Sequence, residues 1–196
     1  MAHGYLSQPQ SRNMLAWSDF CPHCLNAGGP WSVGGGRTWP VGDHGMCGDP
    51  YSTAVPRPHE SGGAHYTGTI AATWTEGNTV EIKTVITAFH MGRFGFRICK
   101  VNGNSAQAER TQLTDACLDQ NILVQADVPG AQAPGDRYYH LGAEGQGTYT
   151  MQYQLPKGLS CDGVNTRCVL QWHYLTGNSC NPPNEPSQYV ANKGLG

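Results

Sequence analysis

The stretch VEIKTVIT at residues 80–87 decides the fold class of this chain. Val80, Ile82 and Ile86 alternate with charged and polar residues, which is the two-residue period of a strand with one buried face. We expect a further strand at residues 66–74. The same alternation recurs in FGFRIC at 94–99, TYTMQYQL at 148–155 and CVLQWHY at 168–174. Five or so short strands with turn residues between them predict an antiparallel β-sandwich.

Length and composition fit one domain of this kind. The 196 residues can form one proper core and fall short of two ordinary domains. Gly (26) and Pro (13) are abundant and only 13% of residues are charged, which favours long loops over long helices. We therefore expect an immunoglobulin- or fibronectin-III-like β-sandwich with long loops, stabilised by disulfides, as a single domain at residues 3–196.

Charge and hydropathy exclude two classes of partner. The formal net charge is -2 and no run of Lys or Arg occurs, so nucleic acid is not an expected partner. No stretch approaches 18 consecutive apolar residues, so no membrane span is expected. We expect a monomer.

Eight cysteines, an even number, indicate a disulfide framework and hence an oxidising, extracellular compartment. We expect Cys99 to pair with Cys117 and Cys161 with Cys168, because each pair closes a turn-rich loop. Four cysteines allow three connectivities, so the pairing of the rest stays open: Cys21, Cys24, Cys47 and Cys180.

The segment Cys21-Pro22-His23-Cys24 also has the spacing of half a zinc site. A structural zinc site needs a second pair at similar spacing. Cys161 and Cys168 are seven residues apart, so the spacing favours disulfides over zinc.

The chain opens Met1-Ala2-His3-Gly4, without the charged and apolar regions of a signal peptide. Residues 1–2 are either a cloned start or the remnant of a signal peptide whose small residue, Ala2, precedes the cleavage point. Both interpretations make His3 the first mature residue of a secreted protein.

A terminal histidine offers two nitrogens, the α-amine and the ring Nδ1, which together can chelate Cu(II). The ordinary pKa of the amine is about 7.7–8.0, so copper can displace its proton at neutral pH. His90 is the candidate for a third nitrogen, because it lies between two predicted strands, where sites collect. The alternatives are a frayed terminal residue and a surface histidine bonded to a carbonyl.

The run HGYLSQPQSR at residues 3–12 resembles the mature start of the chitin-active lytic polysaccharide monooxygenases, the former chitin-binding proteins. The resemblance spans nearly the whole chain, and its later motifs are most similar to the animal branch of these enzymes. Those motifs are CGD at 47–49, PRPHESGG at 56–63, TAFH at 87–90, CVLQW at 168–172 and GN at 177–178.

This resemblance implies roles for individual residues. His3 and His90 would hold one copper ion as a histidine brace, and the methyl group of Ala88 would crowd one axial position of the metal. Tyr189 would supply the aromatic ring on the other axial side; Tyr174 is the rival, but it shares a strand face with core residues. The animal branch continues with Cys-Ala-Asp-Ile after this aromatic residue, whereas residues 190–195 read VANKGL, so the cysteine is missing.

The implied activity is the copper-dependent oxidative cleavage of glycosidic bonds in an insoluble polysaccharide, with O2 or H2O2 and an external reductant. Chitin is the first expectation and cellulose the second. Paired carboxylates at hydrolase spacing are not needed. Glu60 can steer the co-substrate from outside the metal's ligand set, or is a solvated loop carboxylate. Tyr5 can stack on a sugar ring, or is a core aromatic.

Two other functions compete with this one. The first is a non-catalytic chitin-binding defence lectin, which would need no copper. The second is an extracellular copper carrier, which would need no affinity for polysaccharide. A chain that retains Met1 would also chelate Cu(II) through an amine, two amides and an imidazole, without forming the brace.

Overall fold

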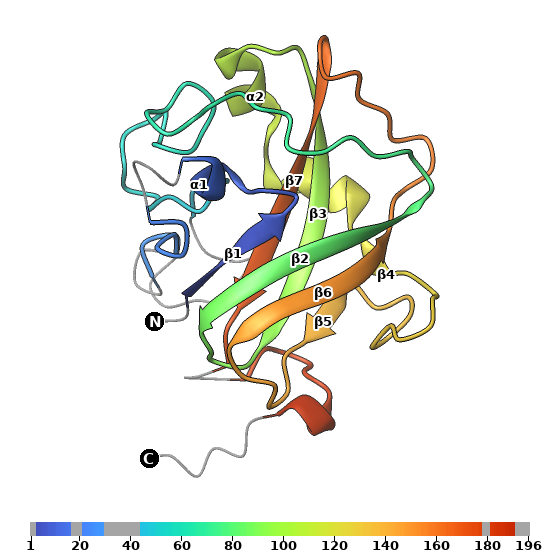
Figure 1. Cartoon of the computed structure of the whole chain (residues 1–196). Helices are drawn as coiled ribbons and strands as arrows, with labels where there is room; N and C mark the ends of the chain where they lie inside the picture. Colours follow the sequence, from blue (N-terminus) through green and yellow to red (C-terminus); the bar gives the residue numbers. More distant parts are fainter. Residues whose placement is uncertain (1–2, 17–20, 30–43, 178–180, 191–196) are drawn as a thin grey trace.

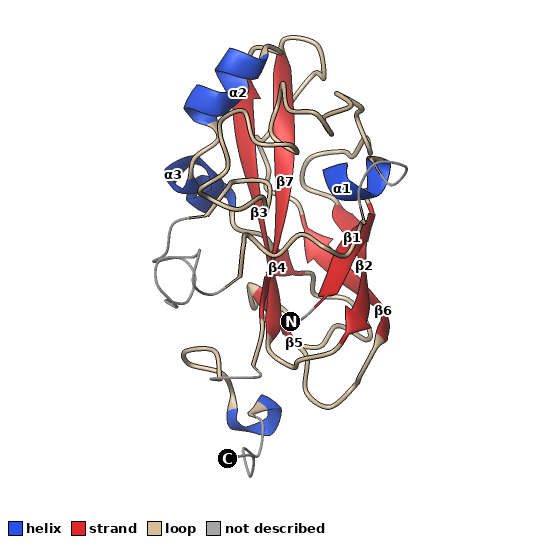
Figure 2. Ribbon diagram, turned by 90° about the vertical axis from the view of Figure 1, so that its left-hand side faces the viewer, coloured by secondary structure: helices blue, strands red, loops and turns tan. Residues whose placement is uncertain are grey.

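The computed structural model describes residues 3–16, 21–29, 44–177 and 181–190. Two antiparallel sheets lie face to face (Figures 1 and 2). The four-stranded sheet has the order β1 (His3–Gln8), β2 (Thr79–Ala88), β6 (Gly147–Gln154) and β4 (Val124–Gln125). The three-stranded sheet has the order β5 (Tyr138–His140), β3 (Arg93–Asn102) and β7 (Thr166–Leu175). The predicted immunoglobulin-like sandwich is confirmed.

The helices are short and lie outside the two sheets (Figure 2). They are α1 (Arg12–Leu15), α2 (Ala106–Gln112), α3 (Asp115–Leu118) and the 3-10 turns η1 (Asp119–Asn121) and η2 (Ser187–Tyr189). The side chains of Ser105 and Thr114 cap α2 and α3 by accepting hydrogen bonds from backbone N–H groups in the first turn. None of the described helices has the length and apolar character needed to span a membrane.

The core lies between the sheets and consists of the apolar residues that alternate along the strands. Ile82 of β2 and Tyr153 of β6 point inward from one sheet, and Phe94 and Phe96 of β3 point inward from the other, all with at most 1% exposure. The Phe96 and Tyr153 rings meet edge-on with centroids 4.7 Å apart. Burying each such side chain contributes about 1.5–3 kcal/mol, so the alternation accounts for the pairing of the sheets.

Two elements differ from the sequence prediction. The strand predicted over residues 66–74 is wrong: this segment is in no strand, and Ile70 is 52% exposed. Only Trp74 packs against the core, so the segment has no buried face to hold it in a sheet. Conversely, β1 lies in a region with little periodicity, where Gly4 and Leu6 form its buried face.

The predicted disulfides Cys99–Cys117 and Cys161–Cys168 are confirmed, and Cys21 pairs with Cys24. Cys180 lies outside the described residues. Cys47 pairs with no described cysteine, and its remaining candidate partner is Cys180, so the place of Cys47 in the framework stays a prediction. Its Sγ accepts a hydrogen bond from Arg12 Nη1 at 3.2 Å, and burial raises the pKa of the thiol to about 12.

Candidate metal centre

His3 is held at one end of the four-stranded sheet by the pairing of β1 with β2. In this register His3 lies opposite Ala88, the last residue of β2, and the Thr87 hydroxyl donates a hydrogen bond to the His3 carbonyl at 3.3 Å. Figure 1 shows the start of β1 beside the arrowhead of β2. The pairing therefore brings His3 to the point where the chain leaves β2.

Gly4 allows β1 to lie this close to its neighbours. A Cβ atom at this position would lie 2.7 Å from both the Ile86 Cδ1 atom and the Val85 carbonyl oxygen. It would also lie 3.2 Å from the Trp172 ring. A larger residue after His3 would push β1 away from β2 and displace His3 from Ala88.

His90 lies in the connection from β2 to β3, two residues after Ala88. Its backbone N–H donates to the Tyr174 hydroxyl at 3.3 Å, and its carbonyl accepts from the Gly177 N–H at 2.8 Å. Gly92 completes the turn at φ 93°, where a Cβ would lie 2.0 Å from the Leu175 carbonyl oxygen. Backbone contacts thus hold this connection, and the half-buried His90 side chain is not needed to shape it.

The ring of His3 contacts a loop that the sequence did not assign to the site. Its Nδ1 lies 3.1 Å from the carbonyl oxygen of His23, and the two rings meet edge-on with centroids 5.6 Å apart. A carbonyl oxygen only accepts hydrogen bonds, so Nδ1 carries the proton in this contact. A metal at Nδ1 would replace this hydrogen bond, because metal binding needs the deprotonated nitrogen.

The nitrogen ligands that His3 and His90 offer are of the type that copper prefers. Two imidazoles come from residues at the same end of the sandwich, and His3 adds a third nitrogen wherever its amine is free. Nitrogen ligands of this type suit Cu(II), and the strand register places Ala88 opposite His3.

The two candidate tyrosines have different environments. Tyr174 packs against Phe94 and contacts the His90 backbone through its hydroxyl, and burial raises the pKa of this phenol, which stays neutral. The Tyr189 ring stacks on His140 with centroids 4.9 Å apart. The structure thus brings the hydroxyl of Tyr174 to the His90 connection and places Tyr189 at the end of β5.

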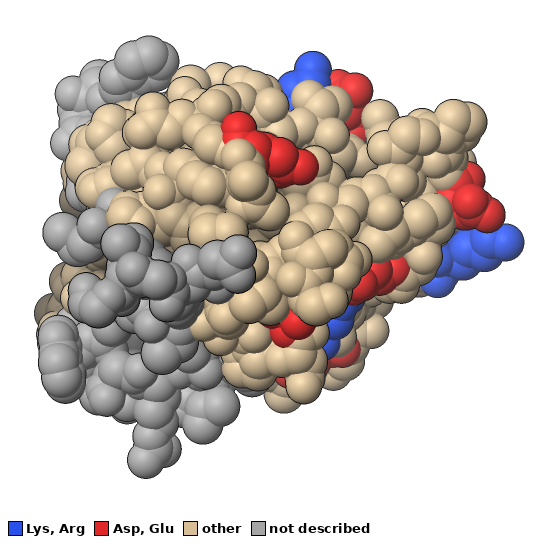
Figure 3. All heavy atoms as spheres, turned by 90° about the horizontal axis from the view of Figure 1, so that it is seen from below, with Lys and Arg blue, Asp and Glu red and all other residues tan. Residues whose placement is uncertain are grey.

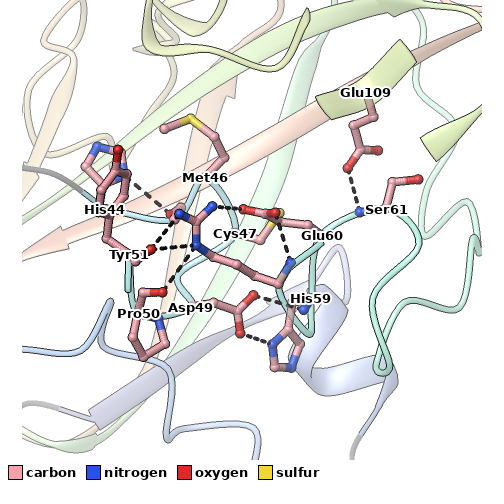
Figure 4. Close-up of polar contacts among 12 residues, drawn as sticks. His44, Met46, Cys47, Asp49, Pro50, Tyr51, His59, Glu60, Ser61 and Glu109 are labelled. Carbon is pink, nitrogen blue, oxygen red and sulfur yellow. Dashed lines mark hydrogen bonds and ion pairs between the residues drawn. The ribbon is translucent and has the colours of Figure 1, made fainter. Parts of the chain in front are cut away.

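Glu60 belongs to a buried polar cluster that holds the loops around residues 44–63 (Figure 4). One carboxylate oxygen pairs with Arg57 Nη1 at 2.8 Å and the other accepts from the Arg57 backbone N–H at 3.1 Å. The alternative of a solvated carboxylate is wrong, because the side chain is 9% exposed. Among the described residues, no hydrogen bond or ion pair joins Glu60 to His3 or His90.

Tyr5 lies on the same face of β1 as His3. The face formed by His3, Tyr5 and Ser7 is partly exposed, whereas Gly4 and Leu6 are buried. Tyr5 is therefore on the partly exposed face of its strand and is not among the buried core residues.

The C-terminal segment is tied to β5 by an ionic network. His140 Nδ1 lies 2.7 Å from Glu185, its Nε2 lies 3.4 Å from Asp136, and Arg93 also pairs with Glu185 at 3.3 Å. Burial opposes the charged imidazolium, but the hydrogen bonds and charges of Glu185 and Asp136 outweigh it and raise the pKa of His140 above its ordinary value.

This network predicts a pH dependence of stability. Because the folded pKa of His140 is raised, its stabilising contribution is complete below the unfolded value of about 6.5 and is lost as pH rises through the folded pKa. Glu185→Gln should therefore lower Tm most at pH 5, and the difference should shrink with rising pH to the part due to Arg93. Thermal melts of both proteins from pH 5 to 9 check this; a constant difference would contradict it.

A β-sandwich that presents two histidines at one end, one of them on the first strand, has nitrogen donors of the kind that suit a copper site. The chain belongs to the lytic polysaccharide mono-oxygenase family: residues 3–189 match the family model described as "Lytic polysaccharide mono-oxygenase, cellulose-degrading". Members of this family act on insoluble polysaccharide by copper-dependent oxidation, with O2 or H2O2 and a reductant, and are typically secreted.

A solved structure supports the same assignment. The chain is similar to "Lytic Polysaccharide Monooxygenase AA15 from Thermobia domestica in the Cu(I) State", with 32% sequence identity. The match covers 89% of this chain and 84% of the other, with a TM-score of 0.70. A search of curated proteins found no match.

Proposed function

We propose that this protein oxidises chitin with one copper ion held by His3 and His90, after removal of Met1 and Ala2 in a secreted precursor. The pairing of His3 with Ala88 carries the proposal. Ala88 precedes His90 by two residues, so the pairing brings His3 to the strand end next to His90. The family description names cellulose, whereas the sequence motifs resemble the chitin-active animal branch. Chitin is therefore the first substrate to test and cellulose the second.

Each residue of the proposed site has its own role. Bound copper supplies the one-electron chemistry that activates O2 or H2O2. His3 and His90 would hold the metal, and the Tyr174 hydroxyl accepts a 3.3 Å hydrogen bond from the His90 backbone N–H. Ala88 would limit access to the metal on one side, and Tyr189 is proposed to do so on the other. Since Arg57 engages both oxygens of Glu60, we propose that Glu60 supports the loop fold instead of contacting the co-substrate.

The surface at this end of the sandwich suits an uncharged substrate. Seen from below, the described part of this face carries few charged side chains, and those are scattered (Figure 3). Crystalline polysaccharides such as chitin carry little charge, so they need aromatic and polar contacts more than ion pairs. Tyr5, on the partly exposed face of β1, is proposed as one such contact.

The test is mass spectrometry of soluble products from β-chitin incubated with copper, ascorbate and protein that begins at His3. We expect oxidised oligosaccharides from this form. The matched control retains Met1, which keeps the His3 nitrogen as an amide; it should bind Cu(II) and release no oxidised product. Cellulose is assayed in parallel.

Each result has a clear meaning. Equal yields from both forms would show that the free terminal amine is not needed, and would refute the brace. Oxidised products from cellulose alone would refute chitin as substrate. Chitin binding that survives a chelator, without any oxidised product, would favour the lectin.

A further inference from the structure

The loop at Cys21–Cys24 gathers metal-binding groups that the proposed reaction does not use. One ligand atom each from Cys21, His23 and Cys24 lies within 4.8 Å of the others, and this is the sole such group of three found in the described part of the chain. None of the three is fully buried. The two sulfurs are joined in a disulfide, so in this state they are not available to a metal.

This loop lies directly against the proposed copper site. The His23 ring centroid is 5.6 Å from that of His3, and the His23 carbonyl oxygen contacts His3 Nδ1 at 3.1 Å. The contact with His3 is made through the backbone of His23, so the ring nitrogens of His23 are not committed to it. The cluster therefore borders the brace without sharing its ligands.

We propose that reduction of the Cys21–Cys24 disulfide creates a second metal site, which binds Cu(I) through two thiolates and the His23 imidazole. Soft thiolate ligands select Cu(I) among the ions available to such a site. A structural zinc site closes with four ligands, and the group here has three. Cys21 and Cys24 are three residues apart, so both sulfurs stay near one ion after the bond between them is broken.

The redox step balances with an external dithiol as reductant. One thiolate of the dithiol attacks a sulfur of the Cys21–Cys24 bond, and its second thiol then resolves the mixed disulfide. The protein gains two electrons and two protons as two thiols, and the reductant leaves as a cyclic disulfide. Each cysteine thiol then releases its proton to solvent when Cu(I) binds. The site is thus closed when the loop is oxidised and open when it is reduced.

The other described disulfides do not offer this chemistry. Cys99 is buried beneath α2 and α3, and Cys161–Cys168 has no histidine grouped with it among the described residues. Cys47 is a partly buried single thiol among the described residues, and desolvation raises its pKa to about 12, so it does not compete for the metal at neutral pH. The inference therefore concerns one loop and can be tested there.

The experiment is an anaerobic titration with Cu(I), in competition with the chromogenic chelator bicinchoninate. The wild-type protein is compared before and after treatment with a phosphine reductant that is removed by desalting, and alkylation with peptide mass spectrometry verifies which cysteines are reduced. We expect the reduced protein to bind one more equivalent of Cu(I) than the oxidised protein. This gain is counted from the oxidised baseline, so it can be read whether or not the brace itself binds copper.

Two variants locate the extra ion. Cys21→Ser/Cys24→Ser should show no gain, and His23→Ala, which keeps the native disulfide and so guards against misfolding, should retain the gain with an affinity at least about 10-fold weaker. X-ray absorption should show sulfur ligands only in the reduced wild type and His23→Ala. No gain despite verified reduction, or a gain that persists in the double serine variant, would overturn the site; an unchanged affinity in His23→Ala would overturn His23 as a ligand.

Discussion

Replacing His90 by alanine is expected to abolish the release of oxidised oligosaccharides and to weaken Cu(II) binding by at least about 100-fold. Losing groups that merely support a metal ligand costs 10- to 100-fold in affinity, so losing a proposed ligand should cost at least as much. The fold should survive, because the His90 connection is held by backbone contacts with Tyr174 and Gly177. Calorimetric titration with Cu(II) and product mass spectrometry measure the two effects.

The matched control is His65→Ala. His65 is a partly exposed histidine whose ring packs against His59, and it follows the motif at residues 56–63 by two positions. Its removal should leave Cu(II) affinity and product yield close to wild type. If His65→Ala lost as much activity as His90→Ala, or if His90→Ala kept both properties, the assignment of His90 would be wrong. Melting curves of the metal-free proteins exclude unfolding as the cause.

The second large effect is expected at the ion pair between α1 and α2. Arg12 binds Glu109 through two hydrogen bonds of 2.7 and 2.9 Å, and it also donates to the His59 carbonyl at 3.0 Å. The Glu109 side chain is 5% exposed and the Arg12 side chain 23%. Glu109→Ala would leave a largely buried guanidinium without its partner, which costs about 3–5 kcal/mol for fully buried pairs.

Because Arg12 keeps some exposure, we expect the free energy of unfolding to fall by about 3 kcal/mol, the lower end of that range. For a chain of this length this corresponds to a Tm roughly 6–12 °C lower. The control is Glu81→Ala, which breaks an exposed pair with Lys83 (3.0 Å) and should cost less than about 1 kcal/mol. Urea unfolding with the disulfides intact compares the two; equal losses would contradict the structural role assigned to Arg12.

This ion pair explains why Arg12 belongs to the first motif of the chain. From the sequence, Arg12 could only be matched to a family pattern, because its partners lie about 50 and 100 residues further along the chain. The structure shows that Arg12 ties the segment after β1 to α2, and so helps to hold the strand that carries His3.

The strand predictions succeeded and failed for one physical reason. Alternation of apolar and polar residues is a local property, so β2, β3, β6 and β7 could be read from residues 80–87, 94–99, 148–155 and 168–174. Whether an extended segment joins a sheet depends on a partner elsewhere in the chain. Residues 66–74 pair with no strand in the described part of the chain, whereas β1, with little pattern of its own, pairs with β2.

By itself the sequence determined the sandwich, two of the disulfides, and the two histidines whose nitrogens suit copper. These depend on the period of side chains along a strand, on short loop closures and on the intrinsic chemistry of single residues. Only the tertiary structure decided that His3 lies opposite Ala88 and that the loop of His23 contacts His3. It also decided that the Glu60 carboxylate forms an ion pair with Arg57. Such contacts join residues distant in the chain, and the packing of the whole core, not any local pattern, selects them.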